Sequence, residues 1–409
     1  MTPHTEEESK YTSKSRYEKT RLPVEEATTL PPDSYYSEQF HKVESQSVFG
    51  HAWTCVGYTC QVDEPGKMLT AQISGQPIVV TRDKQGVLRG FYNVCRHRAS
   101  ILVTEDTILE RFRCPYHSWT YDLTGKLLNC PLFAMSGSCK SYGGEDGSGA
   151  AMFNKEDYSL LPIKVSTWGC FIFANLSTNA EPLSDYLGDL PQIYKNFPLH
   201  ELVLVRRKKY EIQSNWKLIA ENFLEYYHLP WVHPELCEVS AINMHKRNQG
   251  SGMYMSFYAH PLLKGGSAID VDQLPPMPNL NTEEKNSGYF PYIFPNLALF
   301  LFPHHLFVLL MNSDASTHTS ESGDLLVHPS VLHEPQAQTK IDAMFEFYDM
   351  VNKQDILAVE RVQQGIQVRA YPGGRMSYRF EEPVHRFQNM VIDYMTGEKR
   401  IYLADDIYS

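Results

Sequence analysis

The chain has 409 residues, of which 42% are hydrophobic and 21% charged, so it is long enough for two folded globular domains. Its formal net charge of −11 argues against a nucleic-acid partner, because such partners are bound by basic surfaces. No apolar stretch approaches the span of a bilayer and the N-terminus has no apolar signal core, so the sequence predicts a cytoplasmic protein without a membrane segment.

The N-terminal part of the chain divides into a polar stretch and a more apolar one. Residues 1–30 are polar, and we expect them to form a disordered tail. The acidic run at positions 6–8 also argues against a transit peptide, which would be poor in acids. Residues 35–51 have helical spacing, and we expect residues 31–44 to pack as a lead-in segment.

Residues 45–175 have the pattern of a small antiparallel β domain. Short apolar or alternating runs predict strands at TCVGYTC, LTAQI, PIVVTRD, FYNV and CFIFANL. The segment CPYHSWTYDLTGKLL predicts a hairpin that turns at residues 122–125. A stretch rich in Gly and Ser at residues 136–151 predicts a long surface loop.

Two pairs of Cys and His in this domain have the spacing of a metal site. Cys95 and His97 are followed, after sixteen residues, by Cys114 and His117. Two thiolates can hold one iron and two imidazoles the other, which is the ligand set of a Rieske [2Fe–2S] cluster. A zinc site fits less well, since zinc spacings usually group the cysteines and the histidines separately. The pattern therefore favours the cluster, with Trp119 placed to shield it from water.

The other six cysteines lack histidines at such distances. In a chain without an export signal we do not expect disulfides, so we interpret these cysteines as small buried residues. They are Cys55, Cys60, Cys130, Cys139, Cys170 and Cys237.

Residues 184–409 alternate helical and strand-like patterns and predict a second domain of the α+β class. Residues 215–227 and 338–367 have helical spacing, whereas residues 299–311 are strand-like. We therefore expect helices that flank an antiparallel sheet.

A second metal site is predicted in this domain. His228 and His233 lie five residues apart, which places their side chains about 140° apart on a regular helix. Pro230 lies between them, and a kink or π-type turn there would bring both imidazoles to one side. Two histidines and one carboxylate on one face of an iron leave positions open for dioxygen and substrate. The candidates for the carboxylate are Asp342, Glu346, Asp349 and Asp355, any of which could instead lie on a solvated helix face.

The remaining histidines of this domain have no predicted metal role. His304 and His305 follow Pro303 within a strand-like run, so we expect them to point to opposite faces of the sheet. His245 and His260 have no partner at a recognisable spacing.

Both candidate sites carry a resemblance to a known family. NVCRHRAS and CPYHSWTYDLTGKL look like the Rieske domain of ring-hydroxylating and amine-hydroxylating oxygenases, and residues 215–236 are similar to the iron-binding helix of their α subunits. In that family the third iron ligand is an aspartate shortly before a Glu-x-x-Gln-x-Gly element. Asp355 precedes Glu360 and the run RVQQG, so the resemblance favours Asp355 over Asp349. It also implies a helix-grip, START-like catalytic domain.

The same resemblance implies a role for Glu225, three residues before His228. In the family an acid here connects a cluster histidine of a neighbouring subunit to a histidine of the iron site, within a homotrimer. As a carboxylate beside an imidazole, Glu225 would fix the tautomer of His228. Many relatives have aspartate at this place, and the glutamate resembles the branch that acts on quaternary amines.

The implied activity is that of a monooxygenase. The cluster would pass electrons to the mononuclear Fe(II), which activates O2, and one oxygen atom would enter the substrate. Three further runs resemble choline monooxygenase and its quaternary-ammonium relatives: LPPDSYYSEQF, VFGHAWTCVGYTCQV and YPGGRMSYRFEEPVHRFQ. They predict a choline-like substrate, oxidised toward betaine aldehyde and glycine betaine and held by aromatic faces. Because the chain shows no nucleotide fingerprint, we expect electrons from NAD(P)H to arrive through a ferredoxin or flavin reductase.

Two alternatives stay open at this level. The first is an aromatic-ring-hydroxylating dioxygenase α subunit, which would have the same metals and an apolar pocket. The second is a non-enzymatic Rieske electron carrier. That function would explain the cluster but would leave His228, His233 and Asp355 without a role.

Overall fold

The computed structural model describes residues 10–131, 153–239, 242–262, 274–399 and 402. The chain forms two compact units. The β unit comprises Val56–Thr167 with Phe171–Thr178, and the α+β unit comprises the rest of the chain. The loop expected at residues 136–151, with Cys139, lies outside the described residues.

The β unit is antiparallel, as the alternating apolar pattern predicts. Among the described residues, seven strands form one sheet in the order β1-β10-β9-β4-β3-β2-β5, and three short strands form a second sheet, β6-β7-β8. The strands are β1 (Thr54–Tyr58), β2 (Lys67–Ile73), β3 (Gln76–Arg82), β4 (Leu88–Tyr92), β5 (Thr107–Ile108), β6 (Phe112–Arg113), β7 (Thr120–Tyr121), β8 (Leu127–Asn129), β9 (Pro162–Trp168) and β10 (Phe171–Asn175).

The hairpin predicted around residues 122–125 is confirmed. Strands β7 and β8 pair antiparallel, with Tyr121 opposite Leu127. Asp122 stabilises the turn, because its carboxylate accepts hydrogen bonds from the backbone N–H groups of Thr124 and Lys126. Gly125 has a φ of +84°, a left-handed conformation that glycine adopts without strain.

The α+β unit is built on a larger antiparallel sheet. Within the described ranges its seven strands have the order β11-β17-β16-β15-β14-β13-β12. They are β11 (Val203–Ile212), β12 (His245–Arg247), β13 (Tyr254–Ala259), β14 (Gly288–Ile293), β15 (Leu297–Leu301), β16 (Leu306–Ala315) and β17 (His318–Val327). The single strand expected at residues 299–311 is therefore two strands joined by a turn.

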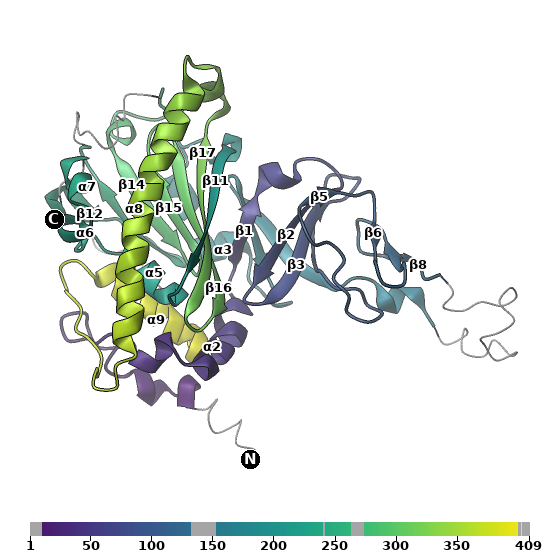
Figure 1. The fold of residues 1–409 in the computed structure, drawn as a ribbon, viewed down its shortest axis with the longest axis horizontal. Helices are drawn as coiled ribbons and strands as arrows, with labels where there is room; N and C mark the ends of the chain where they lie inside the picture. Colours follow the sequence, from purple (N-terminus) through teal and green to yellow (C-terminus); the bar gives the residue numbers. More distant parts are fainter. Residues whose placement is uncertain (1–9, 132–152, 240–241, 263–273, 400–401, 403–409) are drawn as a thin grey trace, which may run out of the picture. The chain divides into compact units, whose positions relative to one another are not determined.

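Helices complete this unit. The long helix α8 (Ala337–Ile366) crosses the sheet and packs against β11 and against α5 (Trp216–Phe223) (Figure 1). Further α-helices within the described residues are α2 (Glu38–Glu44), which continues into a π-helical turn at Ser45–Phe49, α3 (Leu183–Leu187), α4 (Leu190–Ile193), α6 (Leu229–Val232), α7 (Pro234–Val239) and α9 (Glu382–Thr396). The mixed class predicted from the sequence is confirmed. None of the helices in the described part of the chain is long and apolar enough to cross a membrane.

The N-terminal segment differs from the disordered tail expected at residues 1–30. Residues 10–30 pack onto the α+β unit, with Tyr17 and Leu30 buried. Arg21 forms an ion pair with Asp393 of α9 and donates a hydrogen bond to Asn389. A few apolar and charged anchors are enough to order this polar stretch, and residues 1–9 lie outside the described residues.

Helix α5 is anchored at its N-terminus by buried polar contacts. Asn215 is the N-cap, and its side chain accepts a hydrogen bond from the backbone N–H of Lys217. The fully buried ammonium of Lys217 lies 2.7 Å from Glu44, which also accepts from the Trp216 indole. Because an unpaired buried charge is costly, these contacts fix where α5 begins. They therefore also fix the position of Asn222 in its last turn.

Candidate metal centres

The four cluster candidates lie on two loops of the β unit that are built alike. Cys95 follows β4, and its C=O accepts from the N–H of Ala99; Cys114 follows β6, and its C=O accepts from the N–H of Ser118. Ala99 and Ser118 both have left-handed backbone conformations, with φ of 55° and 59°. Two tight turns of the same kind therefore present the two Cys and His pairs.

The structure brings the imidazoles of the two loops together. The ring centroids of His97 and His117 lie 4.7 Å apart, at 70° to each other. Nδ1 of His117 is buried and makes no hydrogen bond among the described residues, which fits an atom whose partner is a metal. Trp119 is buried and stacks on His97 with 4.9 Å between ring centroids, so it shields this end of the site.

The two thiols are also buried and receive polar contacts. Burial raises the pKa of Cys95, whose Sγ lies 3.2 Å from the hydroxyl of Tyr121, a residue not predicted from the sequence. Burial acts in the same direction at Cys114, but hydrogen bonds from the backbone N–H groups of His117 and Tyr116 hold the pKa of Cys114 below its usual value. Such donors stabilise a thiolate, so the four residues fit a [2Fe–2S] cluster with two cysteine and two histidine ligands.

The second candidate site begins where α5 ends. The helix expected at residues 215–227 ends early, at Phe223, and the kink or π-type turn expected at Pro230 is wrong. Residues 224–228 are not helical, and α6 is a separate short helix. His228 and His233 flank α6 as its N-cap and C-cap. Pro230 lies in the first turn of α6, where its missing N–H costs no intrahelical hydrogen bond. The break, rather than a kink, turns both imidazoles to one side.

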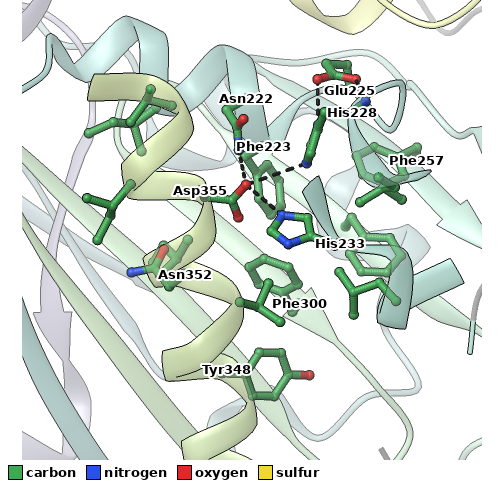
Figure 2. Close-up of a pocket in the computed structure, with 18 of the residues that line it drawn as sticks. Asn222, Phe223, Glu225, His228, His233, Phe257, Phe300, Tyr348, Asn352 and Asp355 are labelled. Carbon is green, nitrogen blue, oxygen red and sulfur yellow. Dashed lines mark hydrogen bonds and ion pairs between the residues drawn. The ribbon is translucent and has the colours of Figure 1, made fainter. Parts of the chain in front are cut away.

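His228, His233 and Asp355 converge in this unit (Figure 2). Nε2 of His233 lies 2.8 Å from the Asp355 carboxylate, and Nε2 of His228 lies 3.6 Å from the same oxygen. One ligand atom from each residue lies within 4.8 Å of the other two. Two imidazoles and one carboxylate on one side of a metal form the facial set that suits non-haem Fe(II).

A further set of side chains orients these three. Nδ1 of His228 lies 2.6 Å from the carboxylate of Glu225, and Nδ1 of His233 lies 2.6 Å from the amide oxygen of Gln354. When each histidine donates its Nδ1–H to that oxygen, its Nε2 carries no proton and keeps a lone pair for a metal. Burial lowers the pKa of His228, but the Glu225 hydrogen bond outweighs it and the net shift is upward.

Two orienting residues were not found from the sequence. Asn222 donates a hydrogen bond to Asp355 at 2.7 Å, and Gln354 donates one to Glu235 at 2.7 Å. Neither residue type is a usual metal ligand, so spacing rules for ligands overlook them. Gln354 is adjacent to Asp355 in the chain, and Asn222 lies in the last turn of α5.

Two of the competing carboxylates on α8 have other partners, and the third is exposed. Burial raises the pKa of Asp349, yet hydrogen bonds from Lys208, Lys353 and Tyr210 lower it to about 2. Asp342 pairs with Arg206, and Glu346 is exposed. Of the four carboxylates considered, Asp355 is the one that lies with both histidines.

The expectation for His304 and His305 is also wrong. They lie in the turn between β15 and β16, not in a strand, and their rings stack instead of facing opposite ways. Nδ1 of His304 lies 2.7 Å from Nδ1 of His305, whose Nε2 lies 2.6 Å from the hydroxyl of Tyr348. His260 contacts Ser287.

A cavity of about 100 Å³ adjoins the His and Asp cluster. Its walls are mostly apolar and rich in aromatic rings, as Figure 2 shows for Phe223, Phe257, Phe300 and Tyr348. Phe290, Phe302 and His245 also line it. His245, for which no role was predicted, stacks on Tyr226 at 5.0 Å between ring centroids.

Comparisons with known proteins match both units. Residues 52–142 match the family model of the Rieske [2Fe–2S] domain, and residues 199–397 match that of the ring hydroxylating alpha subunit (catalytic domain).

Curated relatives align over most of their own length. The glycine betaine monooxygenase oxygenase subunit of Pseudomonas aeruginosa is 28% identical over 88% of this chain and 87% of its own. The chloroplastic choline monooxygenase of Arabidopsis thaliana is 26% identical over 90% and 83%.

Solved structures share the fold. The quaternary ammonium Rieske monooxygenase CntA, in complex with an inhibitor, has a TM-score of 0.78 at 24% identity, covering 93% of this chain and 98% of that chain. A naphthalene 1,2-dioxygenase mutant bound to phenanthrene has a TM-score of 0.75 at 19% identity, covering 95% and 96%.

Proposed function

Since this chain belongs to the Rieske non-haem iron oxygenases, with a Rieske [2Fe–2S] domain and a mononuclear-iron catalytic domain, we propose that it hydroxylates a small, choline-like quaternary ammonium substrate. One oxygen atom of O2 would enter a C–H bond and the other would leave as water, with two electrons and two protons consumed. For choline, hydroxylation of the alcohol carbon gives the hydrate of betaine aldehyde.

We assign the cluster to Cys95 and Cys114 on one iron and to His97 and His117 on the other. What supports this is the pair of matched loops, the adjacent imidazoles and the buried Nδ1 of His117. When bound, the cluster supplies single electrons. The chain contributes burial by Trp119 and donors to the sulfurs, both of which tune the reduction potential.

We assign the mononuclear iron to His228, His233 and Asp355. The observation that carries the assignment is their convergence beside an apolar cavity, with each histidine Nδ1 held by an oxygen of another side chain. When bound, this iron activates dioxygen. The protein supplies fixed tautomers and a cavity that excludes water.

The choice of a quaternary ammonium substrate rests on the cavity and on the relatives. An ammonium without N–H groups cannot be held by hydrogen bonds, and aromatic faces bind it through their quadrupoles. The cavity offers Phe257, Phe290, Phe300 and Tyr348. The names of the curated relatives specify choline and glycine betaine. An aromatic-ring substrate is the competing choice, because the same walls are apolar.

Product analysis under 18O2 tests this proposal. The reconstituted enzyme, supplied with electrons by a reductase system, is incubated separately with choline, glycine betaine, carnitine and naphthalene. We expect consumption of choline with betaine aldehyde or its hydrate as product and with one 18O atom incorporated, detected in the hydrate or after rapid oxidation to the acid. Turnover of naphthalene to a diol, with no product from any ammonium compound, would contradict it.

We further propose that the active assembly is a homotrimer in which the cluster of one chain serves the iron of the next, with Glu225 as the connecting residue. Electrons would come from NAD(P)H through a separate ferredoxin or flavin reductase. The support within this chain is that Glu225 already holds Nδ1 of His228 and accepts from the backbone N–H of Tyr227 and His228. Such a carboxylate has the charge to hold a second imidazole.

We predict that Glu225→Gln keeps both metals and slows electron transfer between them by about tenfold or more, because a neutral amide holds imidazoles less strongly than a carboxylate does. The measurement is single-turnover mixing of the reduced enzyme with O2 and substrate, following reoxidation of the cluster. Glu201→Gln, a partly exposed acid paired with His328, is the control. Cluster oxidation at the wild-type rate in Glu225→Gln, or an active monomer in sedimentation, would refute the connection.

A further inference from the structure

Helix α8 lines part of the cavity, and three of its lining side chains carry polar groups. Tyr348, Asn352 and Asp355 follow one another at spacings of four and three residues, which places them on one face of the helix (Figure 2). With a rise of 1.5 Å per residue, Asn352 lies about 4.5 Å along the axis from Asp355 and about 6 Å from Tyr348. An amide therefore lies between an iron ligand and an aromatic ring.

The nitrogen of the Asn352 amide is held on the side away from the iron site. It donates a hydrogen bond of 2.8 Å to Glu321, a buried carboxyl group on β17. The Asn352 side chain also forms a hydrogen bond with Tyr210. Because the Tyr210 hydroxyl gives its one proton to Asp349, the Asn352 nitrogen is the donor in that bond. Figure 2 shows the amide nitrogen pointing away from His233. Because Glu321 binds the amide nitrogen, the amide oxygen, Oδ1, is the polar atom that Asn352 can offer to a molecule in the cavity.

Glu321 is positioned by the sheet to hold this amide in one direction. Its backbone pairs with Tyr210 on one side and with Met311 on the other. Burial raises the pKa of Glu321 to about 7. Its Oε2 is buried and makes no hydrogen bond among the described residues, so a proton can reside there while Oε1 still accepts from the amide. In either charge state Oε1 serves as the acceptor that orients Asn352.

The other polar side chains named at the cavity serve the candidate iron ligands or each other. The Asn222 amide nitrogen donates to Asp355, and its oxygen lies on the side away from Asp355 (Figure 2). Glu225 holds His228, and the hydroxyl of Tyr348 contacts His305. No Lys or Arg is among the described residues that line the cavity. The described walls therefore offer an amide oxygen close to the iron ligands, and aromatic rings beyond it.

We propose that Asn352 Oδ1 accepts a hydrogen bond from the hydroxyl group of the substrate, and that this contact makes the site selective for amino alcohols. The inference rests on the proposed function and names which quaternary ammonium compound the site prefers. A trimethylammonium group has no N–H, so the hydroxyl is the one strong donor that choline has. Bound one helical turn from Asp355, it holds the adjoining C–H beside the iron ligands, with the ammonium among the aromatic rings.

The same contact disfavours a carboxylate at that position. Glycine betaine has acceptor oxygens where choline has a donor, and two acceptors facing each other in a dry cavity repel. Asn352 is thus a specificity-determining residue. Glu321 is a positioning residue, because it acts on the substrate only through the direction of the Asn352 amide.

The test compares choline with ethyltrimethylammonium, which has the same shape without the hydroxyl. In Asn352→Leu, which keeps the volume but loses the acceptor, we expect KM for choline to rise about tenfold, the effect of one lost hydrogen bond. KM for ethyltrimethylammonium should change by less than about twofold, since no hydrogen bond is lost there. Visible absorption and iron content, measured in parallel, should stay at wild-type values.

Glu321→Gln provides a second, isosteric variant that leaves Asn352 in place and so does not depend on how a leucine packs there. Its amide can present either oxygen or nitrogen to Asn352, so the Asn352 amide is free to turn. We expect KM for choline to rise by a few-fold with kcat nearly unchanged, and again no effect on the deoxy compound.

Equal changes in KM for the two compounds, or no change for either in both variants, would overturn the role of Asn352. Failure of the wild-type enzyme to oxidise either compound is a different result, and it would overturn the proposed function as well.

Discussion

Replacing Asp355 by Ala is expected to empty the mononuclear iron site while leaving the visible spectrum of the cluster unchanged. The carboxylate is one of three groups that converge there, and two imidazoles alone hold Fe(II) weakly. Substrate oxidation should fall by about three orders of magnitude or more, because Glu225, the other carboxylate among the described lining residues, is held by Nδ1 and the backbone N–H of His228. Iron analysis and substrate-dependent O2 uptake measure both effects.

Asp349→Ala is the matched control for this prediction. Asp349 lies on the same helix and is tied to Lys208 and Lys353, which can remain solvated without it. We expect the Asp349 variant to keep its iron and its activity. If instead Asp349→Ala loses the mononuclear iron and Asp355→Ala keeps it, the ligand assignment is wrong.

Replacing Cys114 by Ser is expected to abolish the cluster and its visible absorption, and with it all electron transfer to the second site. A serine oxygen is a poor ligand for iron in such a cluster. The backbone N–H groups of Tyr116 and His117 would be left facing a neutral hydroxyl instead of a thiolate. Activity should therefore drop to background, whether or not the mononuclear iron remains.

The control for this variant is Cys60→Ser, a partly exposed cysteine of the same unit that follows β1. Its spectrum should match that of the wild type. A normal cluster spectrum in Cys114→Ser would exclude Cys114 as a ligand.

The sequence was most informative where residue type and spacing together limit the chemistry. Two interleaved pairs of Cys and His specify a mixed cluster, because few other sites need that combination. The strand patterns of residues 45–175 and the helix expected at residues 338–367 also reflect local physics, namely alternation and helical spacing. The match of residues 199–397 to an oxygenase catalytic domain counts against the carrier alternative.

Other features depend on contacts between distant segments and could not be derived from spacing. Four acids lie along one long helix, and family resemblance alone singled out Asp355; the structure adds that Asp349 is tied to Lys208 of β11. Helix α5 ends at Phe223, seven residues before Pro230, so the break between α5 and α6 is not a kink at that proline. Glu321 lies 31 residues before Asn352 on a different element, and only the packing of α8 on the sheet brings the two side chains together.

The order of the N-terminal segment also depends on contacts with a distant part of the chain. Its composition is polar, which predicts disorder when a segment is considered alone. Arg21 and Leu30 nevertheless find partners on α9, more than 350 residues away. Local composition carries no information about such a partner.

An oxygenase of this kind must hold two different iron sites in one chain. We would measure iron and acid-labile sulfide per chain on anaerobically reconstituted protein, together with EPR of the reduced state. We predict about three irons and two sulfides per chain, with the third iron lost in Asp355→Ala and the spectrum of the reduced cluster retained. About two irons and two sulfides at saturation would make the chain an electron carrier, and zinc without sulfide would remove the cluster altogether.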